Sequence, residues 1–169
     1  MFAVVISGAP GSGKTATLTA LADALAGAEI AHAAIDVDEV AWAYPHPDDA
    51  GRFEYLRGAW QAHRRAGQEL VLVGEVVETP EALRMLLEAV DAEDHLLVRL
   101  DAALPTLRGR ITSREPADWF GLDHLLGLAE QSAAFTGLDG THLVVNTEEL
   151  RPEEVAERIR AARPDRLGG

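Results

Sequence analysis

The sequence predicts an α/β fold in which helices cover both faces of a five-stranded parallel sheet. Three observations support this prediction. Strand-sized apolar runs alternate along the chain with helix-like segments. The runs are continuous and rich in β-branched residues, as expected for strands that are buried on both faces. A glycine-rich motif lies directly between the first apolar run and the first helical segment.

The elements follow one another in a regular order. Strands are recognised as short apolar runs, helices as longer segments bounded by Gly or Pro, and loops by clusters of Pro and Asp. On these criteria we expect strands at 2–6, 30–35, within 69–77, at 95–100 and at 143–145, helices at 14–26, 52–66, 81–90, 103–114, 121–136 and 152–162, and a loop over 42–51.

The length of 169 residues fits one domain, expected over residues 1–163, with a frayed tail at 164–169. With 47% apolar and 25% charged residues, the composition is that of a soluble globular protein. The absence of cysteine excludes disulfides, thiolate nucleophiles and cysteine-ligated zinc.

The charge balance narrows the choice of partners. The formal net charge is −13, from 15 Lys and Arg against 28 Asp and Glu, which argues against a nucleic-acid or anionic-membrane partner. No basic segment precedes the first apolar run, and the apolar runs are too short for a membrane span. We therefore expect a cytoplasmic protein; its oligomeric state cannot be inferred from the sequence.

Polar or glycine-rich segments follow all five predicted strands. In parallel sheets, ligands bind beyond the carboxyl ends of the strands. The functional site is therefore expected along one rim, made by residues 7–15, 36–38 and 74–78, the segment after Leu100, and residues 146–148.

The most specific motif is Gly8-Ala-Pro-Gly-Ser-Gly-Lys-Thr15, which matches the phosphate-binding pattern G-x-x-x-x-G-K-[ST]. Its amides and the start of the following helix favour phosphate oxygens. Lys14, the only lysine in the chain, is predicted to reach the outer phosphates, and Thr15 to bind Mg²⁺. The predicted nucleotide contacts are Gly8, Ala9, Pro10, Gly11, Ser12, Gly13, Lys14, Thr15 and Ala16.

Two carboxylates follow the second predicted strand. Asp36 and Asp38 are two residues apart, so in an extended segment they point the same way, towards the phosphate loop. A carboxylate there can accept a proton from an attacking hydroxyl or hold Mg²⁺. Alternatively, one of the two caps the next helix. For Asp36 we favour the functional interpretation, as a catalytic base, a Mg²⁺ ligand or both; for Asp38 the two interpretations are equally supported.

These motifs resemble the small P-loop kinases, a group that includes shikimate, gluconate and adenylylsulfate kinases, chloramphenicol phosphotransferase and nucleoside monophosphate kinases. The resemblance rests on Gly8–Thr15, on Asp36-Val-Asp38, and on the segment Leu107–Glu115. It implies the three-layer P-loop NTPase fold, ATP and Mg²⁺ as cofactors, and an arginine-bearing lid at about 114–120. By the same resemblance, Lys14, Asp36, Arg110 and Arg114 are catalytic, and Arg110 also binds the nucleotide.

The sequence departs from this group at three places. Shikimate kinase has three glycines after its third strand, where Gly74-Glu-Val-Val-Glu78 stands here, and no Arg or Lys occurs between Arg114 and Arg151. Both differences argue against shikimate as the acceptor. The aspartate that usually ends the Walker B strand is also missing, and Glu75 is the nearest acid.

The acceptor is expected to bind between the loop after the second strand and the helix that follows it. Candidate contacts are Asp38, Trp42, Tyr44, Arg52 and Arg57. Aromatic rings there can stack on a flat or sugar-like ligand. The arginines either bind an acceptor phosphate or face water; the sequence supports both.

The predicted function is therefore transfer of the γ-phosphate of Mg-ATP to a hydroxyl of a small molecule, such as a metabolite or antibiotic. An alternative within the same class is a nucleoside or nucleoside monophosphate kinase. A nucleotide-dependent switch or regulatory ATPase is the alternative of another class, although the guanine-specific N-K-x-D motif is absent: Asn146-Thr-Glu-Glu stands after the last strand.

Overall fold

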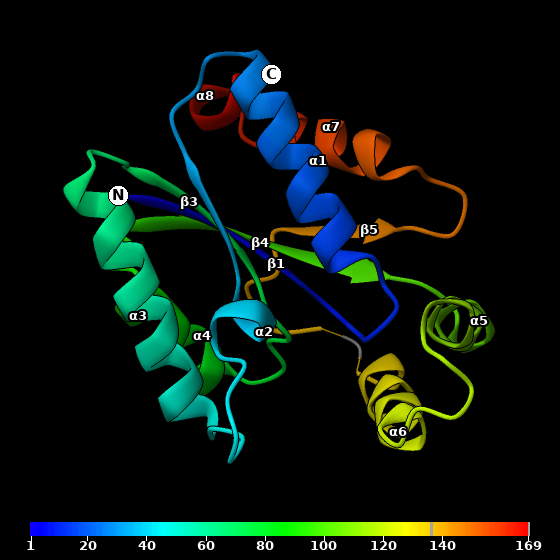
Figure 1. Cartoon of the computed structure of the whole chain (residues 1–169). Coiled ribbons are helices and arrows are strands. Elements are labelled where there is room, and N and C mark those ends of the chain that lie inside the picture. The colour runs from blue at the N-terminus through cyan, green and yellow to red at the C-terminus, as the bar shows by residue number, and fades with distance from the viewer. Residues whose placement is uncertain (136, 169) are drawn as a thin grey trace.

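A computed structural model of the chain, described for residues 1–135 and 137–168, has the predicted α/β fold (Figure 1). The sheet contains five strands in the order β2-β3-β1-β4-β5, and every neighbouring pair is parallel. The strands are β1 (Phe2–Gly8), β2 (Ala33–Asp36), β3 (Leu70–Gly74), β4 (Asp94–Asp101) and β5 (Leu143–Asn146).

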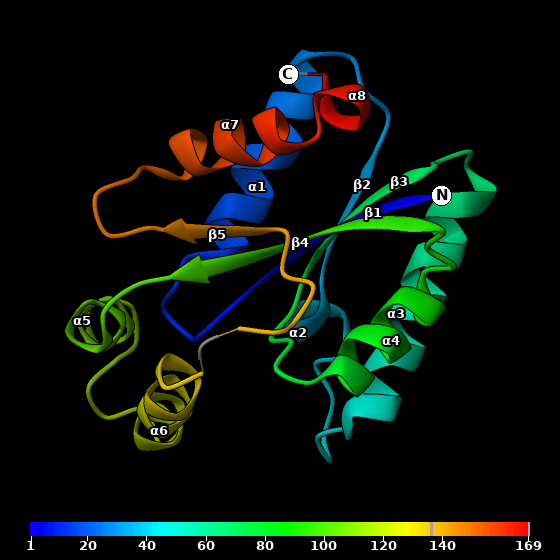
Figure 2. The ribbon, with the colours of Figure 1, turned by 180° about the vertical axis from the view of Figure 1, so that it is seen from behind.

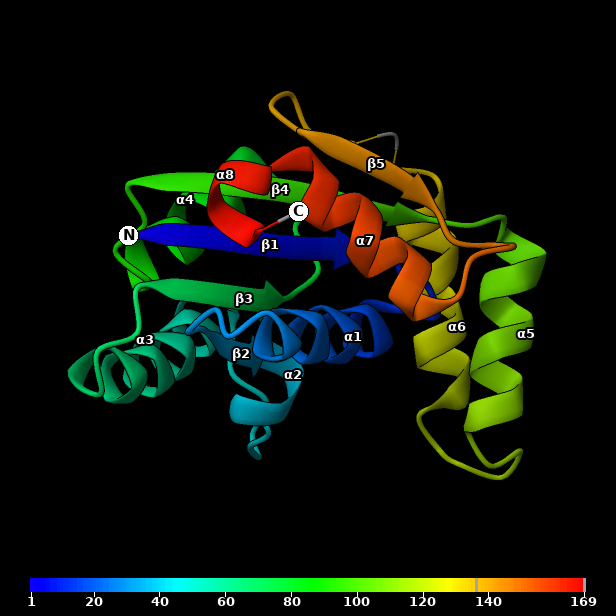
Figure 3. The same cartoon turned by 90° about the horizontal axis from the view of Figure 1, so that it is seen from above.

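Helices form a layer on each face of the sheet, as Figures 1 and 2 show from opposite sides. One layer contains α1 (Lys14–Gly27), α7 (Pro152–Ala162) and α8 (Pro164–Leu167), and the other contains α3 (Asp49–Arg65) and α4 (Pro80–Ala89). The short helix α2 (Val37–Val40) follows β2. Helices α5 (Leu104–Arg114) and α6 (Leu122–Ala133) pack together beside the end of β4 (Figure 3).

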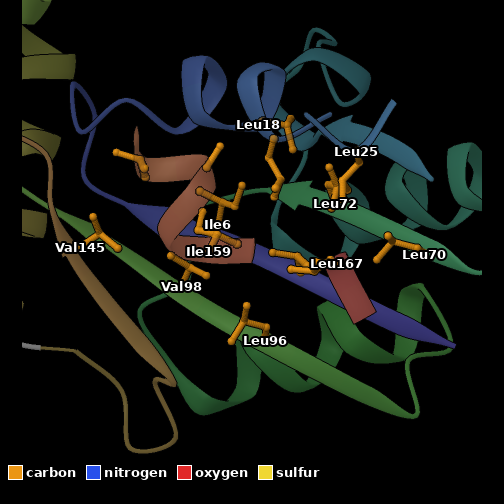
Figure 4. Packing of buried hydrophobic residues seen from close by; sticks show 14 of the residues in the cluster. Ile6, Leu18, Leu25, Leu70, Leu72, Leu96, Val98, Val145, Ile159 and Leu167 are labelled. Atoms are coloured by element: carbon orange, nitrogen blue, oxygen red, sulfur yellow. The ribbon is translucent and has the colours of Figure 1, made fainter. Parts of the chain in front are cut away.

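The central strand β1 supplies side chains to both layers because successive residues point to opposite faces. Val4 and Ile6 belong to the cluster that packs against α1 and α7, part of which is drawn in Figure 4. Ala3 and Val5 belong to the opposite cluster, which includes the fully buried Trp60 of α3. Burial on both faces explains why this strand reads as a continuous apolar run.

The strand register aligns the carboxyl ends of the strands. Gly74 is paired with Ile6 on one side and with Asp36 on the other. On the far side of β1, Gly8 is opposite Leu100. The segments that follow β1, β2 and β3 therefore leave the sheet next to one another, as predicted for a ligand site.

Element bounds shift by a few residues: β2 begins at Ala33 rather than at 30, and α3 begins at Asp49, inside the loop predicted over 42–51. Two differences are larger. The chain turns into α2 directly after β2, because Asp36 caps this helix by accepting a hydrogen bond from the amide of Asp38. The prediction of a frayed tail at 164–169 is wrong for the described residues: α8 forms there and buries Leu167 completely in the core. Thr136, the predicted end of one helix, and Gly169 lie outside the described residues.

Within residues 1–135 and 137–168, none of the helices is both long and apolar enough to cross a membrane.

Candidate active site

The phosphate loop connects β1 to α1 and leaves the start of that helix open. Gly13 precedes α1 with a positive φ of 99°, and no side chain caps the helix. The first amides of the helix therefore have no intrahelical partner and are available to an anion. Within the loop, the amide of Ser12 donates to the carbonyl of Ala9 at 3.0 Å. This geometry fits the phosphate-binding role predicted for the motif.

The side chain of Lys14 reaches back over the phosphate loop to the first residue of the motif. Its ammonium donates to the carbonyl oxygen of Gly8 at 2.9 Å, which leaves two of its three hydrogens for other oxygens. Burial lowers the pKa of Lys14, the carboxylates of Asp38, Glu75 and Asp36 raise it, and the positive charge of Arg114 lowers it further. A phosphate group bound here would therefore gain a cation that is only partly hydrated.

The carboxylate of Asp36 joins the end of β2 to the start of α1. Its Oδ2 accepts a hydrogen bond from the Thr15 hydroxyl at 2.8 Å, and its Oδ1 accepts from the amide of Asp38 at 3.1 Å. A hydroxyl and a carboxylate are the oxygen ligands that Mg²⁺ prefers. The pair predicted to bind Mg²⁺ is thus brought together, and Asp36 also has the capping role proposed as its alternative.

Asp38 points towards α3 instead. Its Oδ1 accepts a hydrogen bond from Nη2 of Arg52 at 2.8 Å, and the same nitrogen donates to Oε2 of Glu75 at 2.6 Å. Glu75 follows β3 and is only 5% exposed. Although burial opposes it, the two carboxylates raise the pKa of Arg52, so this guanidinium is firmly charged. Asp36, Asp38, Arg52 and Glu75 together form what we name the carboxylate cluster.

Arg110 lies on the other side of the phosphate loop. Its Nη2 donates to the carbonyl of Thr147 at 2.7 Å, and its Nη1 donates to the Thr147 hydroxyl at 3.0 Å and to the carbonyl of Gly11 at 3.3 Å. Thr147 is buried, and its hydroxyl lies 3.1 Å from the carbonyl of Ser12. Arg110 thus connects α5, the loop after β5 and the phosphate loop.

Arg114 ends α5 and is largely exposed, with Nε donating to Oε1 of Glu115 at 2.7 Å. Its charge acts on Lys14, as described above. The two arginines that the family resemblance implies are catalytic, Arg110 and Arg114, therefore lie in different surroundings. Arg110 is bound to the backbone of the site, whereas Arg114 is exposed and pairs with its neighbour Glu115. The connection between α5 and α6, residues 115–121, follows it.

Among residues 1–135 and 137–168, the remaining predicted acceptor contacts form no hydrogen bond or ion pair with the carboxylate cluster. Trp42 and Tyr44, in the connection between α2 and α3, are 86% and 94% exposed. Arg57 pairs with Glu54 of its own helix and donates to the carbonyl of Glu88 in α4. Of the arginines predicted for the acceptor, Arg52 is the one that the structure brings to Asp38.

Two contributions escaped the sequence prediction. The carbonyl and hydroxyl of Thr147 anchor Arg110, and the only signal was the position of this residue on the predicted rim. Glu75 was noted as the acid nearest to the Walker B position, but its ion pair with Arg52 of α3 joins residues 23 positions apart. Such a pair depends on how α3 packs on the sheet.

The chain was compared with protein-family models, with curated proteins and with solved structures. No protein-family model matches the chain, and no curated protein matches it. Among solved structures, the APS kinase of Mycobacterium tuberculosis in complex with AMPPNP and APS superimposes with a TM-score of 0.67 at 17% identity, over 95% of each chain. A gluconokinase from Sinorhizobium meliloti 1021 gives a TM-score of 0.67 at 20% identity, over 98% of this chain and 94% of that one.

Shikimate kinase from Acinetobacter baumannii in complex with shikimate gives a TM-score of 0.56 at 16% identity, over 98% of this chain and 94% of that one. These structures share with this protein a parallel α/β sheet and nearly the full length of the chain. At such low identities the similarity concerns the fold. The chain has the fold of the small P-loop kinases.

Proposed function

We propose that this protein is a small-molecule kinase, which transfers the γ-phosphoryl group of Mg-ATP to a hydroxyl group of its acceptor. The observation that carries the proposal is the hydrogen bond between Thr15 and Asp36. It holds the carboxylate of Asp36 against Thr15 of the phosphate-loop motif, and the proposed nucleotide-binding and acceptor sites would share one phosphoryl group beside it. The kinases with the same fold support the proposal.

In this proposal the phosphate loop binds the nucleotide. The open amides at the start of α1 and the ammonium of Lys14 would hold the β- and γ-phosphates. Arg110 holds Gly11 and Thr147 in place and so fixes the shape of the loop. Arg114 is the arginine proposed to approach the γ-phosphate, since it ends α5, its side chain is largely exposed, and among the described residues it forms no hydrogen bond with the backbone of the loop.

Thr15 and Asp36 have the oxygen donors that would hold Mg²⁺ beside these phosphates. When bound, Mg²⁺ offsets negative charge on the phosphate oxygens. Asp36 is already engaged by Thr15 and by the amide of Asp38, so its carboxylate is fixed in orientation. We therefore propose Asp36 as a metal-binding residue rather than as the base.

Asp38 is then the better candidate for the base. Its carboxylate is 63% exposed and lies on the side of Arg52, away from Thr15. The acceptor oxygen would attack the γ-phosphorus while the bond from that phosphorus to the β–γ bridging oxygen breaks and ADP leaves. Asp38 would take the proton from the acceptor hydroxyl.

The test is a screen of ATP consumption across nucleosides, nucleoside monophosphates, sugars and hydroxylated antibiotics, with mass spectrometry of every acceptor. A kinase consumes ATP rapidly only with its acceptor, which gains one phosphoryl group. The Lys14→Ala variant should lose this turnover, and Arg65→Gln, at the far end of α3, should keep it. ATP hydrolysis that a protein partner stimulates, with no phosphorylated small molecule, would instead identify a switch.

A further inference from the structure

The guanidinium of Arg52 faces the proposed acceptor position, and its charge is already offset within the protein. Nη2 of Arg52 donates to Oδ1 of Asp38 and to Oε2 of Glu75. Both contacts are ion pairs, at 2.8 and 2.6 Å, and they come from two different segments of the chain. An arginine intended for an acceptor carboxylate or phosphate would need to give up one of these partners.

Glu75 cannot easily release Arg52. Its side chain is only 5% exposed, and its Oε1 accepts a hydrogen bond from the amide of Val76 at 2.7 Å. The amide of Glu75 itself donates to the carbonyl of Ile6 at 3.2 Å, which continues the pairing between β1 and the β3 side. Breaking the ion pair would leave a buried carboxylate without its partner, which is costly. The pair is therefore a fixed part of the site.

The charge of the carboxylate cluster is negative as a result, and the nearby ammonium of Lys14, on which these carboxylates act, is the group proposed to bind the nucleotide phosphates. The carboxylate cluster contains three acidic side chains, Asp36, Asp38 and Glu75, and the guanidinium of Arg52. It remains negative even if Glu75 holds a proton. An anionic group on the acceptor would be repelled there, because like charges at short range in a partly buried site interact strongly.

Arg52 still has donors for a neutral ligand. Both of its ion pairs use Nη2, so Nη1 and Nε make no hydrogen bond within residues 1–135 and 137–168. Its side chain is 23% exposed, so part of the group is accessible. Hydroxyl oxygens of a ligand can accept from these N–H groups while a neighbouring hydroxyl donates to Asp38. Several adjacent hydroxyl groups on one ligand would satisfy both residues.

We propose that the acceptor is a polyhydroxylated compound without an anionic group, either neutral or carrying an amine, and that Glu75 is the residue that excludes anionic acceptors. This inference rests on the proposed kinase function, and deepens it by naming the charge class of the substrate. Glu75 acts through Arg52, so it is a specificity-determining residue and takes no part in the chemical step.

The first experiment measures binding and does not require knowledge of the acceptor. The protein is saturated with AMPPNP and Mg²⁺, so that the phosphate loop is filled, and titrated with inorganic phosphate by calorimetry. Wild-type protein should bind phosphate weakly, and Arg52→Gln should not change this. Glu75→Gln should bind phosphate about tenfold more tightly or better, because only Asp38 then offsets the charge of Arg52. The gain should vanish in the double variant Glu75→Gln/Arg52→Gln.

Matched controls separate this effect from a general change in charge. Glu78→Gln removes a carboxylate from the same connection, and Arg65→Gln removes an arginine from the same helix; both should bind phosphate as the wild type does. The inference is overturned if wild-type protein binds phosphate in a manner that Arg52→Gln abolishes. That comparison uses only wild type and Arg52→Gln, so it decides the matter even if Glu75→Gln does not fold.

The second experiment measures turnover with acceptors that differ only in charge: glucitol, glucamine and gluconate, and adenosine against AMP. Phosphorylated products should come from the neutral acceptors or from glucamine, and not from gluconate or AMP. The acceptor that is phosphorylated shows whether the site prefers a neutral or an amine-bearing compound. A preference for gluconate or AMP would contradict the inference while supporting the kinase. Failure of AMPPNP to bind, by contrast, would contradict the proposed function itself, so the two failures are distinguishable.

Discussion

The amide of Asp38 donates to Oδ1 of Asp36 at 3.1 Å, so the two carboxylates after β2 are held in different surroundings. Asp36 faces the Thr15 hydroxyl, and Asp38 faces Arg52. In an extended segment Asp36 and Asp38 would point the same way. The first turn of α2 instead directs their carboxylates to different partners. In the proposed function, Asp36 would hold the metal beside the nucleotide and Asp38 would face the acceptor.

The first prediction separates these two acids by kinetics. Asp38→Asn should lower kcat about 10²- to 10⁴-fold, the range for loss of a general base, and leave AMPPNP affinity unchanged. Asp36→Asn should raise the Mg²⁺ concentration needed for half-maximal activity, and excess Mg²⁺ should restore part of the rate. The measurement is a steady-state assay over a range of Mg²⁺ concentrations. Full activity of Asp38→Asn would return the role of base to Asp36.

The second prediction concerns the two arginines of α5, Arg110 and Arg114. Arg110→Gln removes hydrogen bonds to Thr147 and Gly11, and should destabilise the protein by about 1.5–3 kcal/mol and raise the KM for ATP. Thr147→Val keeps the contact between Arg110 and the carbonyl of residue 147, and should reduce the unfolding free energy by less than Arg110→Gln does. Arg114→Gln should instead lower kcat about 10²-fold with little change in stability. Urea unfolding and steady-state kinetics check both effects; equal stability losses for the two arginine variants would refute the distinction.

The third prediction compares two loop glycines that both have positive φ, 83° at Gly11 and 99° at Gly13. Either alanine variant should cost about 1–2 kcal/mol for the left-handed backbone. At Gly11 the added Cβ would also lie 2.7 Å from the carbonyl oxygen of Leu107, whereas nothing lies within 4 Å at Gly13. Gly11→Ala should therefore lose about 1–3 kcal/mol more, because α5 must shift. If urea unfolding gave equal losses of unfolding free energy for the two variants, α5 would shift without cost and the prediction would be wrong.

The fourth prediction is a pH dependence at the far end of the sheet. Burial and the neighbouring charge of His142 lower the pKa of His95 below its ordinary value of 6.5, and the two rings lie 5.0 Å apart. The folded state therefore binds this proton less readily than the unfolded state, and stability is lost as the pH falls below about 6.5. The difference in unfolding free energy between His95→Gln and wild type should shift in favour of the variant from pH 7.5 to pH 5. A constant difference would contradict the assignment.

Much of the fold is predictable because the signals are local. The continuous apolar run at 2–6 and the phosphate motif that follows it define β1, its loop and the start of α1 from neighbouring residues alone. Because ligands bind beyond the carboxyl ends of parallel strands, Asp36 is expected beside the phosphate loop. The hydrogen bond between Asp36 and Thr15 confirms that placement. The spacing of strands and helices suffices for the order of the elements.

The features that escaped prediction depend on contacts between distant segments or on very short ones. Arg52 and Glu75 meet because α3 packs against β2, the neighbour of β3 in the sheet, which no local pattern records. Helix α2 has one turn and owes its start to the cap at Asp36. The polar composition after Arg163 indicates a loose tail, yet Leu167 of α8 is fully buried in the core, and Arg166 lies over the ring of Phe2.

The central claim is that Gly8–Thr15 binds the phosphates of a nucleotide through Lys14, and calorimetric titration of AMPPNP with Mg²⁺ tests it most directly. Wild-type protein should bind AMPPNP at one site per chain. Lys14→Ala should weaken binding at least about tenfold, as expected for loss of a charged hydrogen bond, while Arg65→Gln should bind as the wild type does. Equal affinity of Lys14→Ala and wild-type protein for AMPPNP would contradict the account at its foundation.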